Sequence, residues 1–165
     1  MNKTITQDVL ATKGVRFLNF IIDYIVFIII NFAIGAAIGF ISEVTGNYTL
    51  YDFIVYNDSL LFEYGYTIVV WTIYYTTMES LTGKSIGKFI TKSQAVMADG
   101  SKLTFEKALV RSLCRFIPFE PFSFLGEDGK GWHDSISKTY VIDDKRFREK
   151  KETVQGLEEI GKPIE

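Results

Sequence analysis

The stretch FLNFIIDYIVFIIINFAIGAAIGFI, residues 17–41, contains a single charged side chain, that of Asp23. An α-helix rises about 1.5 Å per residue, so this stretch reaches roughly 37 Å, enough to cross a hydrocarbon layer of about 30 Å. A signal peptide is the alternative, but its apolar region runs to only about 7–15 residues and carries no carboxylate. The sequence therefore predicts a transmembrane helix over residues 17–41.

The stretch LLFEYGYTIVVWTIYYTTMESL, residues 60–81, predicts a second transmembrane helix. Its tyrosines and Trp71 are amphipathic, and those near its ends suit the two membrane interfaces. The uncharged part, residues 64–78, is short for a span, so a buried amphipathic helix of a soluble protein is the alternative.

The basic residues are segregated along the 165-residue chain, whose length suits one domain. No Lys or Arg occurs from residue 17 to residue 83, whereas a soluble domain distributes them over its whole surface. By the positive-inside rule, both termini are expected in the cytoplasm and the 42–59 connection outside. A net charge of −2 argues against a nucleic-acid binder, and one Cys with one His excludes a disulfide framework and a Cys/His zinc site.

The chain after the second apolar stretch has the pattern of a small cytoplasmic element. Residues 93–98 and 139–142 are expected to form paired strands, and Thr104 can cap a helix. The following FIPFEPFSFL, residues 116–125, is too short to span and contains two prolines. We therefore expect the segment 104–125 to lie at the membrane interface.

Basic side chains recur every four residues on the helix after Thr104, and more basic residues follow the second apolar stretch. Beside a membrane span such a face is expected to contact anionic headgroups, and a solvated charged surface is the alternative. The expected headgroup contacts are Lys84, Lys88, Lys107, Arg111 and Arg115.

Polar residues inside the first predicted span need a physical reason. Arg16, Asn19 and Asp23 are spaced i, i+3 and i+7, so they share one helix face. An ionised aspartate at mid-membrane costs roughly 2.5–3.5 kcal/mol, so Asp23 must find a partner inside the protein or take up a proton. We expect Arg16, Asp23, Glu79 and Asp134 to form one cluster at the inner leaflet, which is either a proton- or cation-binding site or a salt-bridge clasp between the spans.

The sequence resembles the RDD family of small bacterial membrane proteins, which is named for an arginine and two aspartates. The arginine and first aspartate of the family match Arg16 and Asp23 in RFLNFIIDYIV, and the second aspartate matches Asp134 in GWHDSISKTYVI. The segment MESLTGKSIGKFI, residues 78–90, is similar to the family's glutamate followed by Gly-x-Thr-x-Gly-Lys, with Ser85 in place of threonine. The resemblance extends over residues 12–143, and the third apolar segment is shorter here than in many members.

The resemblance implies a multi-pass protein of the bacterial inner membrane that is suspected of transport. We expect an all-α membrane protein with two transmembrane helices, a short third membrane-associated segment, and a small cytoplasmic element made of a β-hairpin and an amphipathic helix. Its parts would be a cytoplasmic N-terminal segment, residues 1–15, a membrane domain, residues 16–143, and a charged cytoplasmic tail, residues 144–165.

Two functions are consistent with these features. The first is proton- or cation-coupled transport through Asp23, and it predicts a homo-oligomer or a larger membrane partner, because two or three helices cannot enclose a polar pathway. The alternative is a non-transporting adaptor in the lipid bilayer with a basic cytoplasmic face. We expect no enzyme, because no nucleophile–base set is visible and the adjacent His133 and Asp134 do not form the His–Asp contact of a catalytic triad. We also expect no cofactor and no metal.

Overall fold

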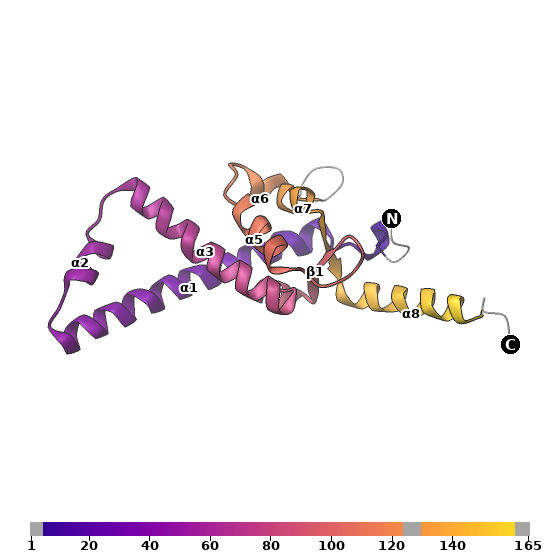
Figure 1. Cartoon of the computed structure of the whole chain (residues 1–165), viewed down its shortest axis with the longest axis horizontal. Helices are drawn as coiled ribbons and strands as arrows, with labels where there is room; N and C mark the ends of the chain where they lie inside the picture. The colour runs from indigo at the N-terminus through magenta and orange to yellow at the C-terminus, as the bar shows by residue number, and fades with distance from the viewer. Residues whose placement is uncertain (1–4, 124–129, 161–165) are drawn as a thin grey trace.

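The computed structural model of the chain describes residues 5–123 and 130–160. Its longest element is α1 (Lys13–Thr45), which meets α3 (Leu60–Thr82) near the middle of the molecule, while α2 (Thr49–Val55) lies between their far ends (Figure 1). Both predicted apolar helices are therefore present, and α1 extends beyond the 17–41 stretch at both ends.

Local chemistry sets the ends of these two helices. The Thr12 hydroxyl oxygen accepts a hydrogen bond from the Val15 backbone N–H at 3.3 Å, which caps α1. Gly46 ends α1 with a φ of 69°, and Gly83 ends α3 with a φ of 74°. Glycine adopts this left-handed conformation without the steric cost that a Cβ carbon would add.

Among the described residues, α1 is the one helix that is long and apolar enough to cross a membrane. The 23-residue helix α3 is long enough but is rich in tyrosine and threonine, so its composition does not confirm the second predicted span.

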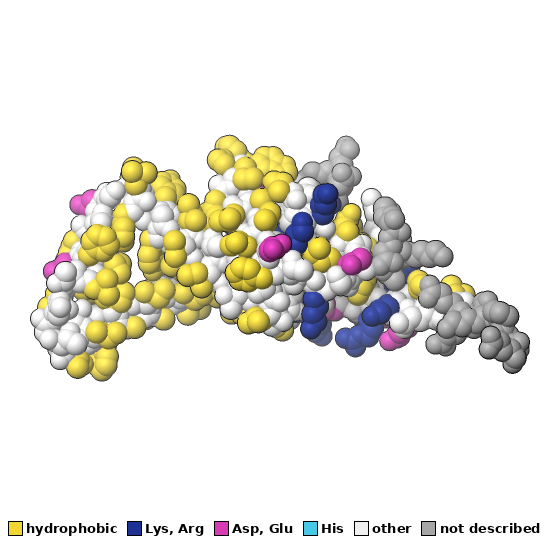
Figure 2. All heavy atoms as spheres, viewed as in Figure 1, with side chains coloured by type: hydrophobic (Ala, Val, Ile, Leu, Met, Phe, Trp, Pro, Cys, Tyr) yellow, Lys and Arg dark blue, Asp and Glu magenta, His cyan; other side chains and the backbone are white. Residues whose placement is uncertain are grey.

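Both helices expose large apolar side chains along most of their length. Phe32 of α1 is 78% exposed and Leu61 of α3 is 86% exposed. Figure 2 shows hydrophobic side chains over the α1–α3 half of this face, while the Lys and Arg side chains lie in the other half. Soluble monomers rarely expose apolar patches of this extent, so this surface suits a lipid environment.

The other half of the molecule contains a two-stranded antiparallel sheet. The strands β1 (Ser93–Met97) and β2 (Thr139–Asp143) pair with Ala95 opposite Val141, which confirms the predicted strand pairing. A small core joins this sheet to the 3₁₀ turn η1 (Gln7–Val9) and to α8 (Asp144–Ile160), and its buried members are Ile5, Val9, Val96 and Ile142. Most of the expected charged tail is thus the helix α8.

Two short units of this half have the same construction. In one, α4 (Ile86–Thr91) leads through Lys92 to β1; in the other, α7 (Trp132–Ser137) leads through Lys138 to β2. Lys92 and Lys138 both adopt the left-handed conformation, with φ of 55° and 57°. The two strands also bury the same positions. The local sequences FITKS (89–93) and SISKT (135–139) are alike. The chain therefore contains an internal repeat, and the two copies pair with each other through β1 and β2.

The segment between the two units holds α5 (Phe105–Cys114) and α6 (Glu120–Ser123). Thr104 caps α5 as predicted, since its hydroxyl oxygen accepts from the Lys107 N–H at 3.4 Å. Before α6, Phe119 has a φ of 66°, which is unusual for a bulky residue. This turn exposes Phe119 and buries Glu120. The last two residues of the expected interfacial segment 104–125 lie outside the described residues.

Candidate functional site

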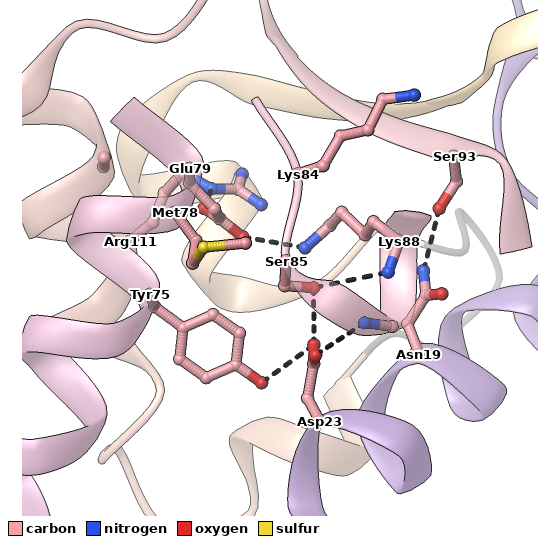
Figure 3. Close-up of polar contacts among 12 residues, drawn as sticks. Asn19, Asp23, Tyr75, Met78, Glu79, Lys84, Ser85, Lys88, Ser93 and Arg111 are labelled. Carbon is pink, nitrogen blue, oxygen red and sulfur yellow. Dashed lines mark hydrogen bonds and ion pairs between the residues drawn. The ribbon is translucent and has the colours of Figure 1, made fainter. Parts of the chain in front are cut away.

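Asp23 of α1 is buried and has both carboxylate oxygens occupied (Figure 3). Oδ1 accepts from the Tyr74 hydroxyl at 2.9 Å and from the Gly87 backbone N–H at 2.8 Å. Oδ2 accepts from the Tyr75 hydroxyl at 3.1 Å and from the Ser85 hydroxyl at 2.6 Å. Hydroxyl and amide donors therefore compensate the cost of burying this carboxylate.

The link between α3 and α4 supplies two of these donors. Ser85 caps α4 by accepting from the Lys88 N–H at 3.4 Å, and it also donates to Asp23. Gly87 brings the α4 backbone so close to α1 that an added Cβ carbon would lie 2.6 Å from the Asn19 carbonyl oxygen. The Gly-x-Ser-x-Gly-Lys segment, residues 83–88, therefore holds α4 against the face of α1 that contains Asp23.

Glu79, near the end of α3, is the centre of a buried ionic cluster. Its Oε1 lies 2.7 Å from the Lys88 Nζ and 3.2 Å from the Arg115 Nη2. Its Oε2 accepts from the Arg111 Nε at 2.9 Å. Burial lowers the pKa of Lys88, although the Glu79 carboxylate opposes this shift. One carboxylate thus binds three cations from α4, α5 and the residue after α5.

Asp134 of α7 extends the same network to α1. Its carboxylate pairs with Arg16 and with Arg111, and Arg111 also contacts the Thr139 hydroxyl. Burial alone would raise the pKa of Asp134, but His133, Arg16 and Arg111 hold it well below its usual value. Since Arg111 also binds Glu79, a continuous chain of ion pairs joins α1, α7, α5 and α3.

Glu120 and His133 form a second buried pair beside this network. The His133 Nδ1 hydrogen-bonds Glu120 Oε1. Burial lowers the pKa of His133 to about 4, so its ring is neutral at pH 7. A neutral ring that donates its Nδ1–H keeps the Glu120 carboxylate satisfied inside the protein.

The charged groups in and around this network balance. Four cations, Arg16, Lys88, Arg111 and Arg115, accompany four carboxylates, Asp23, Glu79, Glu120 and Asp134. The group of eight is therefore neutral as a set, which is the arrangement a low-dielectric environment requires.

A polar cavity of about 40 Å³ opens beside Asp23. A single water needs about 10–15 Å³ by this measure, so the cavity has room for about two or three waters or for a monovalent cation. Its polar lining comes from several elements and consists of Arg16, Asn19, Asp23, Lys88, Arg115, Glu120 and His133.

Three of the four residues of the expected cluster are connected by ion pairs, and Asp23 lies beside them. Arg16, Glu79 and Asp134 belong to one network through Arg111, which the sequence did not place there. Asp23 lies at the neighbouring cavity, where three hydroxyls and a backbone N–H donate to its carboxylate.

The expected headgroup contacts are wrong for three of the five basic residues. Lys88 and Arg111 are buried, and Arg115 turns inward to Glu79. Their ion pairs with buried carboxylates keep them inside. Lys84 is partly exposed and pairs with Asp144, and Lys107 is partly exposed; headgroup contact by these two stays a prediction.

Sequence reasoning missed the tyrosine and serine donors to Asp23 and the buried Glu120–His133 pair. Tyr74 and Tyr75 were interpreted only as amphipathic rings along the second apolar stretch, and Ser85 only as a replacement for threonine. The one available signal for Glu120 was a carboxylate inside an apolar, proline-containing segment, where an unpaired charge would be costly.

A family model described as the RDD family matches residues 10–138. The chain belongs to the RDD family. RDD is a family of small membrane proteins, so the apolar surface of α1 is that of a membrane protein. Neither a curated protein nor a solved structure matches this chain. In this RDD protein, Arg16 and Asp23 line the polar cavity, and Asp134 pairs with Arg16 from the opposite side of the fold.

Proposed function

We propose that this RDD protein crosses the bacterial inner membrane twice, through α1 and α3, and carries a proton or a monovalent cation across it through Asp23. The observation that carries the proposal is the polar cavity beside Asp23, a carboxylate in the mainly apolar helix α1. Ionisable groups inside membrane helices are costly and are most often retained for ion pathways or proton relays.

A membrane position for α3 is supported by its contacts with α1. Tyr74 and Tyr75 of α3 bond to Asp23, and Trp71 stacks on Phe27 of α1 at 4.6 Å between ring centroids. If α1 crosses the bilayer, these contacts keep α3 at the same depth. Basic residues precede α1 and follow α3, so the positive-inside rule favours a cytoplasmic position for both termini.

Polar and aromatic layers alternate along the two helices. The polar cavity at Asp23 lies nearest the proposed cytoplasmic side. The stacked rings of Phe27, Trp71 and Tyr75 form the next layer. A pocket of about 390 Å³ lined in part by Asn31 and Glu63 lies beyond the stack. Two polar sites separated by an apolar layer are what a gated ion pathway requires.

Asp23 couples ion binding to helix contacts in this mechanism. Its charged carboxylate accepts four hydrogen bonds that tie α1 to α3 and α4. A proton or cation that occupies its lone pairs competes with these donors, which loosens the contact of Ser85 and Gly87 with α1. Occupancy of the site would thereby change the position of α4.

Assembly completes the proposal. The far halves of α1 and α3 diverge toward α2 (Figure 1), so one copy does not enclose a pathway there. Since polar groups in the hydrocarbon layer must be covered by protein, we propose a homo-oligomer or a larger membrane partner in the lipid bilayer.

The test is ion flux into proteoliposomes for the wild type, Asp23→Asn and the control Asp58→Asn, whose carboxylate is exposed in the connection between α2 and α3. All three proteins are first checked for equal insertion and thermal stability. We expect flux for the wild type and Asp58→Asn and its loss for Asp23→Asn. Equal flux in all three would remove Asp23 from the mechanism.

A non-transporting adaptor is the second candidate, and the neutral cluster of mutually paired charges favours it, because ion pairs between helices are sufficient for a structural clasp. The exposed basic residues of α8 would then contact a protein or the headgroups. Two results together would favour this function. The wild type would show no flux, and changing Lys145, Arg148 and Lys151 to glutamine would abolish binding to vesicles or to a partner.

A further inference from the structure

A second cavity, of about 350 Å³, lies between α1, α3 and the residues that follow α5. Its walls are mainly apolar and aromatic, and they include Tyr24, Tyr64, Ile68, Trp71 and Phe116. We call this cavity the lateral groove. Its volume is within the range of small-molecule sites, roughly 300–1,000 Å³.

The lateral groove borders the polar cavity at Asp23. Phe20, Arg115 and Glu120 line both spaces. One molecule could therefore place an apolar chain among the aromatic rings and a polar head at the border of the ionic cluster. This combination of surfaces fits an amphiphile.

Arg115, which lines both spaces, has a guanidinium that is only partly hydrogen-bonded within the described residues. Its guanidinium lies 4.0 Å from the Tyr75 ring centroid, and its Nη2 reaches Glu79 at 3.2 Å. Its buried Nε has no hydrogen-bond partner among the described residues. A buried, unsatisfied N–H of a charged group is costly, so an acceptor oxygen placed there would be favourable.

We propose that the lateral groove binds one long-chain fatty acid, with its chain along Trp71 and Ile68 and its carboxyl group accepting from the Arg115 Nε–H. The inference rests on the proposed position of α3 in the bilayer, and it does not require transport.

The shape of the site favours a single-chain amphiphile over a phospholipid. The polar end has only about 40 Å³ of space, which suits a carboxyl group rather than a phosphodiester with its headgroup. Because the ionic cluster beside it is already neutral, the head of the ligand needs an acceptor oxygen but no net charge. A carboxyl group supplies one in either protonation state.

Trp71 provides a direct probe, because the chain contains two tryptophans and the other, Trp132, can be replaced by phenylalanine. Trp132→Phe protein is reconstituted into phosphatidylcholine nanodiscs, and Trp71 fluorescence is followed during titration with brominated fatty acid, brominated phosphatidylglycerol or brominated phosphatidylcholine. Thr67→Phe narrows the groove. Val69→Phe adds the same ring at an exposed position that is not part of the groove lining, and serves as its matched control.

We expect brominated fatty acid to quench Trp71 saturably at a low mole fraction, in the parent protein and in Val69→Phe but not in Thr67→Phe. Arg115→Gln is expected to raise the half-saturating concentration about tenfold or more, because a hydrogen bond to a charged group is lost. Quenching that grows linearly with mole fraction, or that is equal in Thr67→Phe and Val69→Phe, would overturn the inference.

Saturable quenching by brominated phosphatidylglycerol but not by fatty acid would also overturn it in favour of a two-chain lipid. The outcomes separate this inference from the proposed topology. Quenching by bulk brominated phosphatidylcholine without a saturable component contradicts the groove site alone. No quenching by any brominated lipid would place Trp71, and hence α3, outside the bilayer.

Discussion

Gly87 lies against Asn19 with so little space that a Cβ carbon at position 87 would meet the Asn19 carbonyl oxygen at 2.6 Å and the Asn19 Cα carbon at 3.0 Å. The same Gly87 donates its backbone N–H to Asp23. The close approach of α4 to α1 and the burial of the aspartate therefore depend on one another.

Gly87→Ala is expected to destabilise the protein by about 1–3 kcal/mol, because two backbones would have to separate and the bond to Asp23 would lengthen. Thermal unfolding in a mild detergent measures this effect. Gly65→Ala is the matched control, since a Cβ carbon at position 65 of α3 has no other atom within 4 Å. A melting temperature for Gly87→Ala equal to that of Gly65→Ala would contradict the described packing.

Glu79→Gln is expected to cost about 3–5 kcal/mol, because it leaves Lys88, Arg111 and Arg115 with one carboxylate too few in a buried site. Adding Lys88→Met removes one of these cations and restores neutrality. The double variant should therefore be more stable than Glu79→Gln alone. A double-mutant cycle in which the two costs simply add would show that Glu79 and Lys88 do not form a buried ion pair.

Stability is expected to fall as the pH decreases from 7 to 5. His133 has a pKa of about 4 when folded and 6.5 as an isolated side chain. In this window the unfolded chain takes up a proton that the folded protein does not, so lower pH favours unfolding. The loss at pH 5 should be about 2 kcal/mol.

His133→Gln removes this titration and provides the control for the pH series. It should be less stable than the wild type at pH 7.5, yet lose less stability between pH 7.5 and pH 5. Parallel pH profiles for the two proteins would mean that His133 does not change its protonation behaviour on folding.

Trp71→Ala is expected to increase proton leakage through proteoliposomes several-fold, if the stacked rings of Phe27, Trp71 and Tyr75 separate the two polar sites. Ile73→Ala, on the exposed side of α3, should leave leakage unchanged. A fluorescent pH indicator inside the vesicles measures both. Wild-type leakage in Trp71→Ala would exclude the stack as a barrier.

Sequence periodicity was sufficient for the polar face of α1. The i, i+3, i+7 spacing of Arg16, Asn19 and Asp23 predicted a shared inward face, and all three side chains are buried. Turn and cap residues likewise located β1, β2 and the start of α5. These features are local, since they depend on residues within a few positions of one another.

The partners of Asp23 and Asp134 could not be read in the same way. Tyr74 and Tyr75 reach Asp23 because of the way α1 meets α3, and Arg111 reaches Asp134 because α5 packs against α7. Glu120 is buried next to Phe119, whose positive φ forms the turn before α6, and it pairs with His133 of α7. Such contacts depend on tertiary geometry, so Lys88, Arg111 and Arg115 appeared in the sequence to be surface residues.

The central claim, that α1 and α3 both cross the bilayer, is tested most directly by cysteine labelling in intact bacterial cells. In a Cys114→Ser background, Asp58→Cys lies in the connection between α2 and α3, and Lys151→Cys lies in α8. The account predicts that a membrane-impermeant maleimide labels position 58 in intact cells and position 151 only after permeabilisation. If both positions become labelled under the same condition, they lie on the same side of the membrane, α3 does not cross it, and the account is contradicted.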